Sequence, residues 1–202
     1  TMDGMKETVI KKDYIYLWED LVDSADLTKI LDWWKENKEN DLNDFDTLPW
    51  FEDSALYYNE CIGTPIEKEV TKIRDKMLEA ARKSYNKPEI VPNTTTLVQW
   101  KEGKYMTAHK DNGYENDKDD LFMREFTAVM YINDDYEGGE TFVLDEESGD
   151  EVISYEPKKN TMLIFRSDSS CEHGVKEITA GRRLTMSMWF TTLDEYEEPL
   201  NY

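Results

Sequence analysis

The fold is decided by one stretch, in which strand-like runs alternate with turn residues: Phe126-Thr127-Ala128-Val129-Met130-Tyr131-Ile132, then Asn133-Asp134-Asp135 and Gly138-Gly139, then Thr141-Phe142-Val143-Leu144. β-Branched and aromatic residues favour strands, whereas Gly, Asn and Asp favour turns. Similar β-rich runs lie on both sides, at residues 94–100, 105–110, 151–155, 161–165, 174–178 and 184–191. About eight short strands in one chain predict a double-sheet jelly roll or a related barrel.

The sequence before residue 94 is partly helical. Residues 14–18 have the composition of a strand, and Ser24 is expected to cap a helix that ends near Asn37. A second helix is expected to begin at Thr64-Pro65-Ile66-Glu67, which has the pattern of a capping box with proline at the first helical position. The polar residues 38–62 are expected to be irregular.

The length of 202 residues fits a single domain, mainly β with N-terminal helices. Within it we expect an N-terminal strand and supporting helices over residues 1–93. The jelly-roll core is expected over residues 94–192, and a C-terminal tail over residues 193–202.

The net charge of −21 argues against nucleic acid as a partner, because phosphate contact needs clustered Lys and Arg. The same charge favours a basic peptide or protein as partner, or serves only to keep the surface solvated. No apolar run is long enough to span a membrane, so no membrane association is expected. Two cysteines, Cys61 and Cys171, are too few for a disulfide framework, and a reducing, cytoplasmic location is expected.

The chain has two histidines, His109 and His173, and His109 forms a His-x-Asp unit with Asp111. Alternate residues of a strand point to the same side, so His109 and Asp111 are expected to project together. Two imidazoles and one carboxylate are the ligand set of non-haem Fe(II) oxygenases, which leave the other coordination positions open. The alternative is a pair of ordinary packed or surface histidines.

Arg183 lies in the strand-like run that follows His173, and no acidic residue follows nearby in that run. A buried guanidinium needs an anionic partner. A small carboxylate ligand would supply that partner, because the planar guanidinium binds a carboxylate through two parallel hydrogen bonds. The alternative places Arg183 on the outer face beside Arg182.

Taken together, these elements resemble the prolyl-4-hydroxylase branch of the Fe(II)/2-oxoglutarate dioxygenases. The resemblance covers roughly residues 94–192 and rests on motifs in a fixed order: His109-x-Asp111, Tyr131-Ile132-Asn133-Asp134, Glu137-Gly138-Gly139-Glu140-Thr141, His173, Arg183 and Trp189. It implies a double-stranded β-helix (jelly-roll) core supported by helices.

The resemblance also implies roles for individual residues. The metal ligands, and thus the catalytic residues, would be His109, Asp111 and His173. The distal carboxylate of 2-oxoglutarate would be bound by Arg183, with hydroxyl partners Tyr131 and Thr185. The substrate pocket would be lined by Trp189 and Trp100.

The activity implied is hydroxylation of an unactivated C–H bond, on a prolyl residue of a peptide or protein. Fe(II) would be the cofactor, 2-oxoglutarate and O2 the cosubstrates, succinate and CO2 the products, and ascorbate a reductant. The sequence departs from many relatives, which carry tyrosine near the position of Trp100 and also at the position of Met106. Two alternatives remain: a non-catalytic barrel used for binding or structure, and a hydroxylase of a free amino acid.

Overall fold

The structure is a computed structural model that describes residues 4–40, 54–113 and 121–200. The described strands are β1 Lys6–Lys11, β2 Ile15–Glu19, β3 Ser54–Tyr57, β4 Val91–Lys101, β5 Met106–His109, β6 Phe126–Tyr131, β7 Glu137–Gly138, β8 Thr141–Leu144, β9 Glu151–Tyr155, β10 Thr161–Arg166, β11 His173–Val175, β12 Ile178–Ala180 and β13 Arg182–Thr191. The described helices are α1 Ser24–Asn37, α2 Tyr58–Cys61 and α3 Glu67–Tyr85, with short 3-10 turns at Ser169–Cys171 and Asp194–Tyr196.

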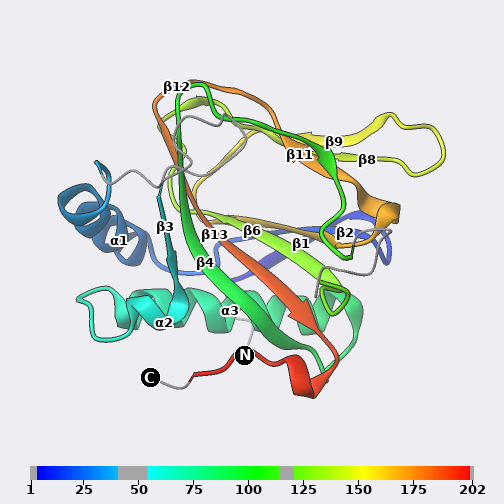
Figure 1. Cartoon of the computed structure of the whole chain (residues 1–202), viewed down its shortest axis with the longest axis horizontal. Helices are drawn as coiled ribbons and strands as arrows, with labels where there is room; N and C mark the ends of the chain where they lie inside the picture. The colour runs from blue at the N-terminus through cyan, green and yellow to red at the C-terminus, as the bar shows by residue number, and fades with distance from the viewer. Residues whose placement is uncertain (1–3, 41–53, 114–120, 201–202) are drawn as a thin grey trace.

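The strands form two main sheets that face each other, and helices cover the larger one from outside (Figure 1). The larger sheet has seven strands in the order β1-β2-β10-β6-β13-β4-β3, and the smaller has four in the order β5-β11-β8-β9. Strands β12 and β7 form a separate pair. This arrangement confirms the predicted jelly roll with N-terminal helices.

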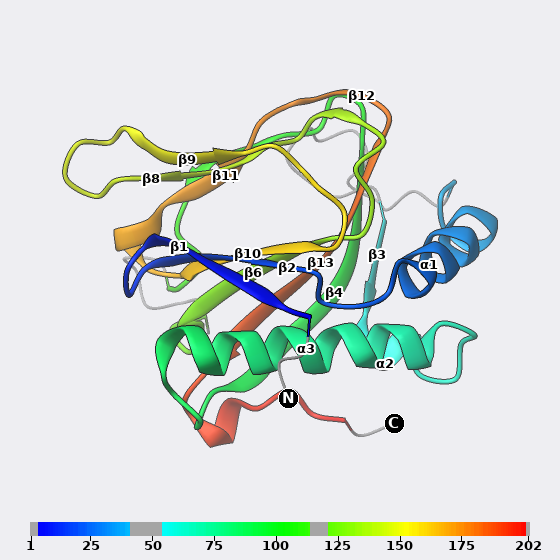
Figure 2. The same cartoon turned by 180° about the vertical axis from the view of Figure 1, so that it is seen from behind.

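Each strand of the larger sheet has one face toward the helices and one toward the smaller sheet. On β6, Phe126, Ala128 and Met130 are buried in the same apolar cluster as the inward faces of α1 and α3. The view from behind shows α3 lying across this face of the sheet (Figure 2). Since side chains alternate along a strand, Thr127 and Tyr131 point the other way, into the space between the two sheets. That interior contains the candidate site.

A smaller apolar cluster lies in the barrel interior beside His173. It consists of Ile15, Val143, Leu163, Phe165 and Cys171, which come from both sheets and are all at most 1% exposed. Its members are contributed by β2, β8 and β10, together with the 3-10 turn before β11. The N-terminal strand pair therefore belongs to the barrel sheet itself.

Several local predictions are wrong. Ser24 is the first helical residue, and its helix begins after Asp23 without a side-chain cap. The second long helix begins at Glu67 rather than Pro65, and the Thr64 hydroxyl donates to the carbonyl of Cys61. Thr64 is therefore not the cap: the helix begins after Ile66, and no side chain caps its first turn.

The irregular region and one strand also need correction. Residues 54–61, expected to be irregular, form β3 and α2, and β3 pairs with β4. Residues 41–53 of that region lie outside the described part of the chain. The run 174–178, expected to be one strand, is divided between β11 and β12. No helix in the described part of the chain is long and apolar enough to cross a membrane.

Candidate metal and cosubstrate site

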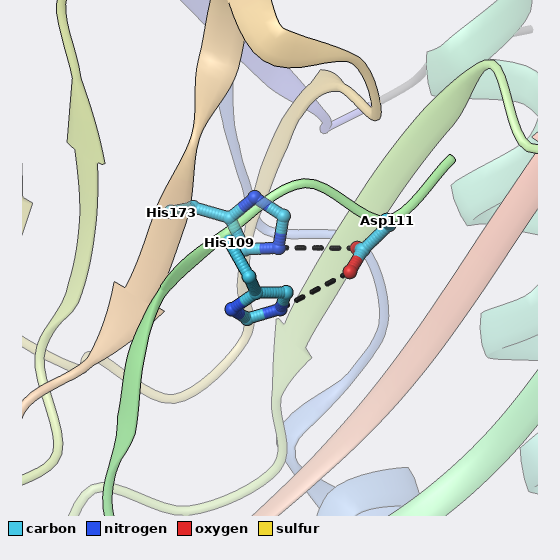
Figure 3. Close-up of side chains that lie close together, drawn as sticks. All are labelled: His109, Asp111 and His173. Carbon is cyan, nitrogen blue, oxygen red and sulfur yellow. Dashed lines mark ion pairs between the residues drawn. The ribbon is translucent and has the colours of Figure 1, made fainter. Parts of the chain in front are cut away.

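Two neighbouring strands of the smaller sheet bring the two histidines together. Strands β5 and β11 pair with His109 opposite His173, and the centres of the two rings lie 4.5 Å apart. Asp111 follows β5, where its backbone N–H donates to the carbonyl of Ser167 at 2.8 Å. One ligand atom from each of His109, Asp111 and His173 lies within 4.8 Å of the other two (Figure 3). The three predicted metal ligands thus converge on one point.

The tautomer of each histidine follows from its backbone partner. The Nδ1 atom of His109 lies 2.7 Å from the carbonyl of Thr107, and that of His173 lies 3.0 Å from the carbonyl of Cys171. Because a carbonyl only accepts, each Nδ1 carries the proton and each Nε2 presents its lone pair when the ring is neutral. A hydrogen bond from Nδ1 to a backbone carbonyl gives metal-binding imidazoles this orientation.

The Asp111 carboxylate faces both Nε2 atoms at the same separation. Oδ1 lies 3.1 Å from Nε2 of His109, and Oδ2 lies 3.1 Å from Nε2 of His173 (Figure 3). Burial alone raises the pKa of Asp111, but the charge of His173 and the hydrogen bonds from both histidines and Trp189 outweigh it. The pKa of Asp111 is therefore well below its usual range, and the group is an anion.

A lone pair of a neutral imidazole facing a carboxylate oxygen is favourable only with a cation between them. A proton on the imidazole supplies that cation in the absence of metal: the hydrogen bond to Asp111 raises the pKa of His109, although burial lowers it. Two imidazole nitrogens and one carboxylate oxygen on one side also match the ligands of a divalent iron. The residues present therefore fit such an ion.

A second group of polar residues surrounds Arg183, farther along the barrel interior. Arg183 is 4% exposed, its Nε donates to the carbonyl of Gly139, and its Nη2 donates to Thr141 Oγ1, both at 3.1 Å. No carboxylate in the described part of the chain forms an ion pair with it. A Cβ added to Gly139 would lie 3.1 Å from Arg183 Cδ and equally close to the ring of Tyr136, so glycine admits both side chains here.

Three buried polar groups near Arg183 lack a hydrogen-bond partner within the described residues: the Trp100 indole N–H, the Tyr136 hydroxyl and the Thr185 hydroxyl. The Trp100 ring lies 5.6 Å from the Arg183 guanidinium, and Trp100 is the register partner of Arg183 on β4. Thr185 follows Arg183 on the same face of β13. Leaving buried donors unpaired is costly, so this end of the interior fits a bound anion with several oxygens.

Tyr131, the other predicted cosubstrate residue, lies at the same end. Its ring is fully buried with its centre 5.5 Å from the Arg183 guanidinium, and its hydroxyl shares a short hydrogen bond with Thr141. Burial raises the pKa of Tyr131, although Arg183 lowers it, so the phenol keeps its proton. Thr141 connects Tyr131 to Arg183, because it also accepts from the Arg183 guanidinium.

The two tryptophans expected in the substrate pocket lie at opposite ends of this interior. Trp100 lies beside Arg183, whereas the Trp189 indole donates to Asp111 Oδ2 at 3.0 Å. Three further residues of this interior were not predicted from the sequence: Tyr136, Thr127 and Ser167. Strand alternation from Tyr131 would have found Thr127, but Tyr136 lies in a turn where alternation gives no signal.

Comparison with known proteins shows which family and which folds this chain resembles. Residues 95–191 match the family model of the 2OG-Fe(II) oxygenase superfamily. The chain is 37% identical over 75 residues to human prolyl 3-hydroxylase 2, and 31% identical over 75 residues to chicken prolyl 3-hydroxylase 1. These matches cover 37% of the chain but only 11% and 10% of the two relatives. The chain therefore spans about a tenth of the length of the curated relatives it matches.

Solved structures show the same fold. The viral collagen prolyl hydroxylase of Paramecium bursaria Chlorella virus-1, solved with 2OG, superimposes with a TM-score of 0.65 at 15% identity, covering 92% of this chain and 99% of that one. A prolyl-4-hydroxylase from Pseudomonas putida gives 0.65 at 16% identity, covering 88% and 91%. A Trichoplax adhaerens prolyl hydroxylase, solved with a hypoxia inducible factor peptide, gives 0.66 at 15%, covering 91% and 86%. The architecture is thus that of prolyl-hydroxylase-like oxygenases.

Proposed function

We propose that this chain is an Fe(II)- and 2-oxoglutarate-dependent dioxygenase that hydroxylates a prolyl residue of a peptide or protein. The observation that carries the proposal is the pairing of two sites in one barrel interior. One site is the group of metal-ligand atoms of His109, Asp111 and His173. The other is the set of buried donor groups around Arg183 that have no acceptor within the described residues. A 2-oxo dicarboxylate has an oxo-acid group for the first site and a carboxylate for the second.

The residues of each site have distinct tasks in such a reaction. His109, Asp111 and His173 would hold Fe(II), which supplies oxidation by O2 coupled to breakdown of 2-oxoglutarate to succinate and CO2. Arg183 would fix the far carboxylate of 2-oxoglutarate through charge-assisted hydrogen bonds, and so orient its oxo-acid group toward the metal. The Thr185 hydroxyl and the Trp100 indole N–H would donate to the same carboxylate. Buried Phe165 lies against His173 and keeps water from one side of the metal.

The exposure of the ligands supports a large substrate. The side chain of His109 is 32% exposed, whereas those of Asp111 and His173 are 9% and 8% exposed. The metal site is therefore accessible from the His109 side, where an extended peptide can reach it. The prolyl 3-hydroxylase relatives and the prolyl hydroxylase folds support proline as the target. The peptide seen with one of those folds supports a peptide or protein substrate.

The proposal is tested by incubating the protein with Fe(II), 2-oxoglutarate and ascorbate, with and without proline-containing peptides. We expect succinate to form and the peptide to gain the mass of one oxygen atom, with 3- and 4-hydroxyproline distinguished after hydrolysis. Omission of ascorbate shows whether it is needed as reductant. Turnover of free proline without turnover of any peptide would contradict the substrate, and absence of succinate under all conditions would contradict the enzyme.

The charge of −21 leads us to propose a basic peptide as the preferred partner. An acidic protein attracts a cationic partner. At physiological ionic strength, salt largely screens this attraction beyond about 8 Å. Matched peptides that differ only in Lys or Glu residues flanking the proline measure this directly. We expect the Lys-flanked peptide to react faster, with an advantage that shrinks as salt is added. Equal rates for both peptides would leave the acidic surface with a role in solvation alone.

A further inference from the structure

The Asp111 carboxylate accepts hydrogen bonds from side chains of the opposite sheet. Its Oδ2 atom accepts from the Thr127 hydroxyl at 2.8 Å and from the Trp189 indole N–H at 3.0 Å. Thr127 and Trp189 come from neighbouring strands of the opposite sheet, where they are register partners on β6 and β13. The larger sheet thus places two donors side by side against one oxygen of a ligand that belongs to the smaller sheet.

The direction of the hydrogen bonds around Thr127 follows from counting protons. A hydroxyl has one proton, and the ionised carboxylate of Asp111 can only accept, so Thr127 donates to Asp111. Ser167 must then be the donor in the hydrogen bond of 2.8 Å between the Ser167 and Thr127 hydroxyls. The carbonyl of the same Ser167 also accepts from the backbone N–H of Asp111. Ser167, fully buried, therefore fixes both the backbone of Asp111 and the orientation of the Thr127 hydroxyl.

Trp189 has a corresponding support on its other side. The Arg124 guanidinium lies 4.1 Å from the centre of the Trp189 ring, within the distance of a cation–π contact. A cation over an indole draws electron density from the ring and strengthens its N–H as a donor. Both donors to Oδ2 are thus held and polarised by a further residue.

We infer that Thr127 and Trp189 are positioning residues that reserve Asp111 Oδ1 for the metal by occupying Oδ2. This inference rests on the metal site proposed above. Oδ2 also lies 3.1 Å from Nε2 of His173. With Oδ2 engaged by Thr127 and Trp189, the carboxylate would bind the ion through Oδ1, and a position that a bidentate carboxylate would take would stay open for cosubstrate and O2. Groups that hydrogen-bond to a metal ligand typically contribute about 10- to 100-fold to metal affinity.

The test measures metal binding alone, with no 2-oxoglutarate present. The protein is titrated with Co(II), and its dissociation constant and absorption spectrum are compared among variants whose fold is verified by circular dichroism. Thr127→Val removes the hydroxyl at equal volume, Thr127→Ser restores it, and Trp189→Phe removes the indole N–H but keeps an aromatic ring. Trp100→Phe is the matched control, since it removes an indole N–H from the same interior at the end away from Asp111.

We expect Thr127→Val and Trp189→Phe each to raise the Co(II) dissociation constant by about 10-fold and to change the cobalt spectrum. Thr127→Ser and Trp100→Phe are expected to bind Co(II) within about twofold of the unmodified protein, because neither removes a donor to Oδ2. Binding that is unchanged or tighter in both donor-removing variants overturns the inference, as does a loss in Thr127→Ser as large as in Thr127→Val. Failure of the unmodified protein to bind Co(II) would instead overturn the metal site and the inference together.

Discussion

The metal end and the Arg183 end of the barrel interior are both polar, but they need ligands of opposite charge. At the metal end, two imidazole lone pairs face the two oxygens of Asp111 at 3.1 Å, so acceptors face acceptors. At the Arg183 end, a guanidinium and three further donor groups share few acceptors within the described residues. The first arrangement calls for a cation and the second for an anion. One interior therefore holds complementary binding sites for a metal and for a carboxylate that reaches it.

Removing a metal ligand would disrupt the metal end and leave the Arg183 end intact. We predict that His173→Ala lowers the affinity for Co(II) by more than about 100-fold, beyond the cost of losing a group that only hydrogen-bonds to a metal ligand. Calorimetric titration measures this directly. The variant should still bind an anion at the Arg183 end, because no donor there is changed. Retained Co(II) affinity in a folded His173→Ala protein would show that the ion binds elsewhere.

Removing the guanidinium would disrupt the Arg183 end and leave the metal end intact. We predict that Arg183→Ala raises the apparent KM for 2-oxoglutarate by about ten- to a hundredfold, the value of one charge-assisted contact. The matched control is Arg182→Ala, because the neighbouring Arg182 points outward and interacts with Glu39. We expect Arg182→Ala to leave the KM unchanged. Equal effects of the two substitutions would show that general positive charge, rather than the buried contact, attracts the cosubstrate.

The Tyr136 hydroxyl sharpens the comparison, since it is a buried donor with no partner in the described chain. We predict that Tyr136→Phe weakens 2-oxoglutarate binding by about three- to tenfold, the value of one neutral hydrogen bond. The same change should leave the thermal unfolding temperature of the ligand-free protein unchanged or higher, because it removes an unsatisfied polar group. A lower unfolding temperature with unchanged cosubstrate affinity would mean that the hydroxyl serves the fold instead.

The sequence was most informative where strand alternation and residue order decide the outcome. Arg183 and Thr185 share a face of β13 because they lie two residues apart. Asp111 instead lies just beyond the end of β5, where its backbone bond to Ser167 holds it. Pairing between distant strands is not readable in this way. The contact of Thr127 and Trp189 with Asp111 depends on the register of β6 against β13 and on the approach of the opposite sheet. A single sequence carries no local signal for either.

The predicted start of the second long helix was wrong for a different physical reason. Thr64, Pro65 and Glu67 have the spacing of a capping box, but the Thr64 hydroxyl donates to the carbonyl of Cys61 three residues earlier. That turn delays the helix to Glu67. The sequence shows the spacing of a capping box but not the turn that connects the helix to α2, which packs against β3 and β4. The barrel assignment was unaffected, because it depended on many strands rather than on one helix end.

The most direct test of the account compares two ligands that differ only in the far carboxylate. Metal-loaded protein is titrated with 2-oxoglutarate and with 2-oxopentanoate, which keeps the oxo-acid group but has a methyl group in place of that carboxylate. We predict that 2-oxoglutarate binds at least about tenfold more tightly, and that Arg183→Ala removes most of this preference while leaving 2-oxopentanoate binding unchanged. Equal affinities of the unmodified protein for the two ligands would contradict the assignment of the Arg183 end as a carboxylate site.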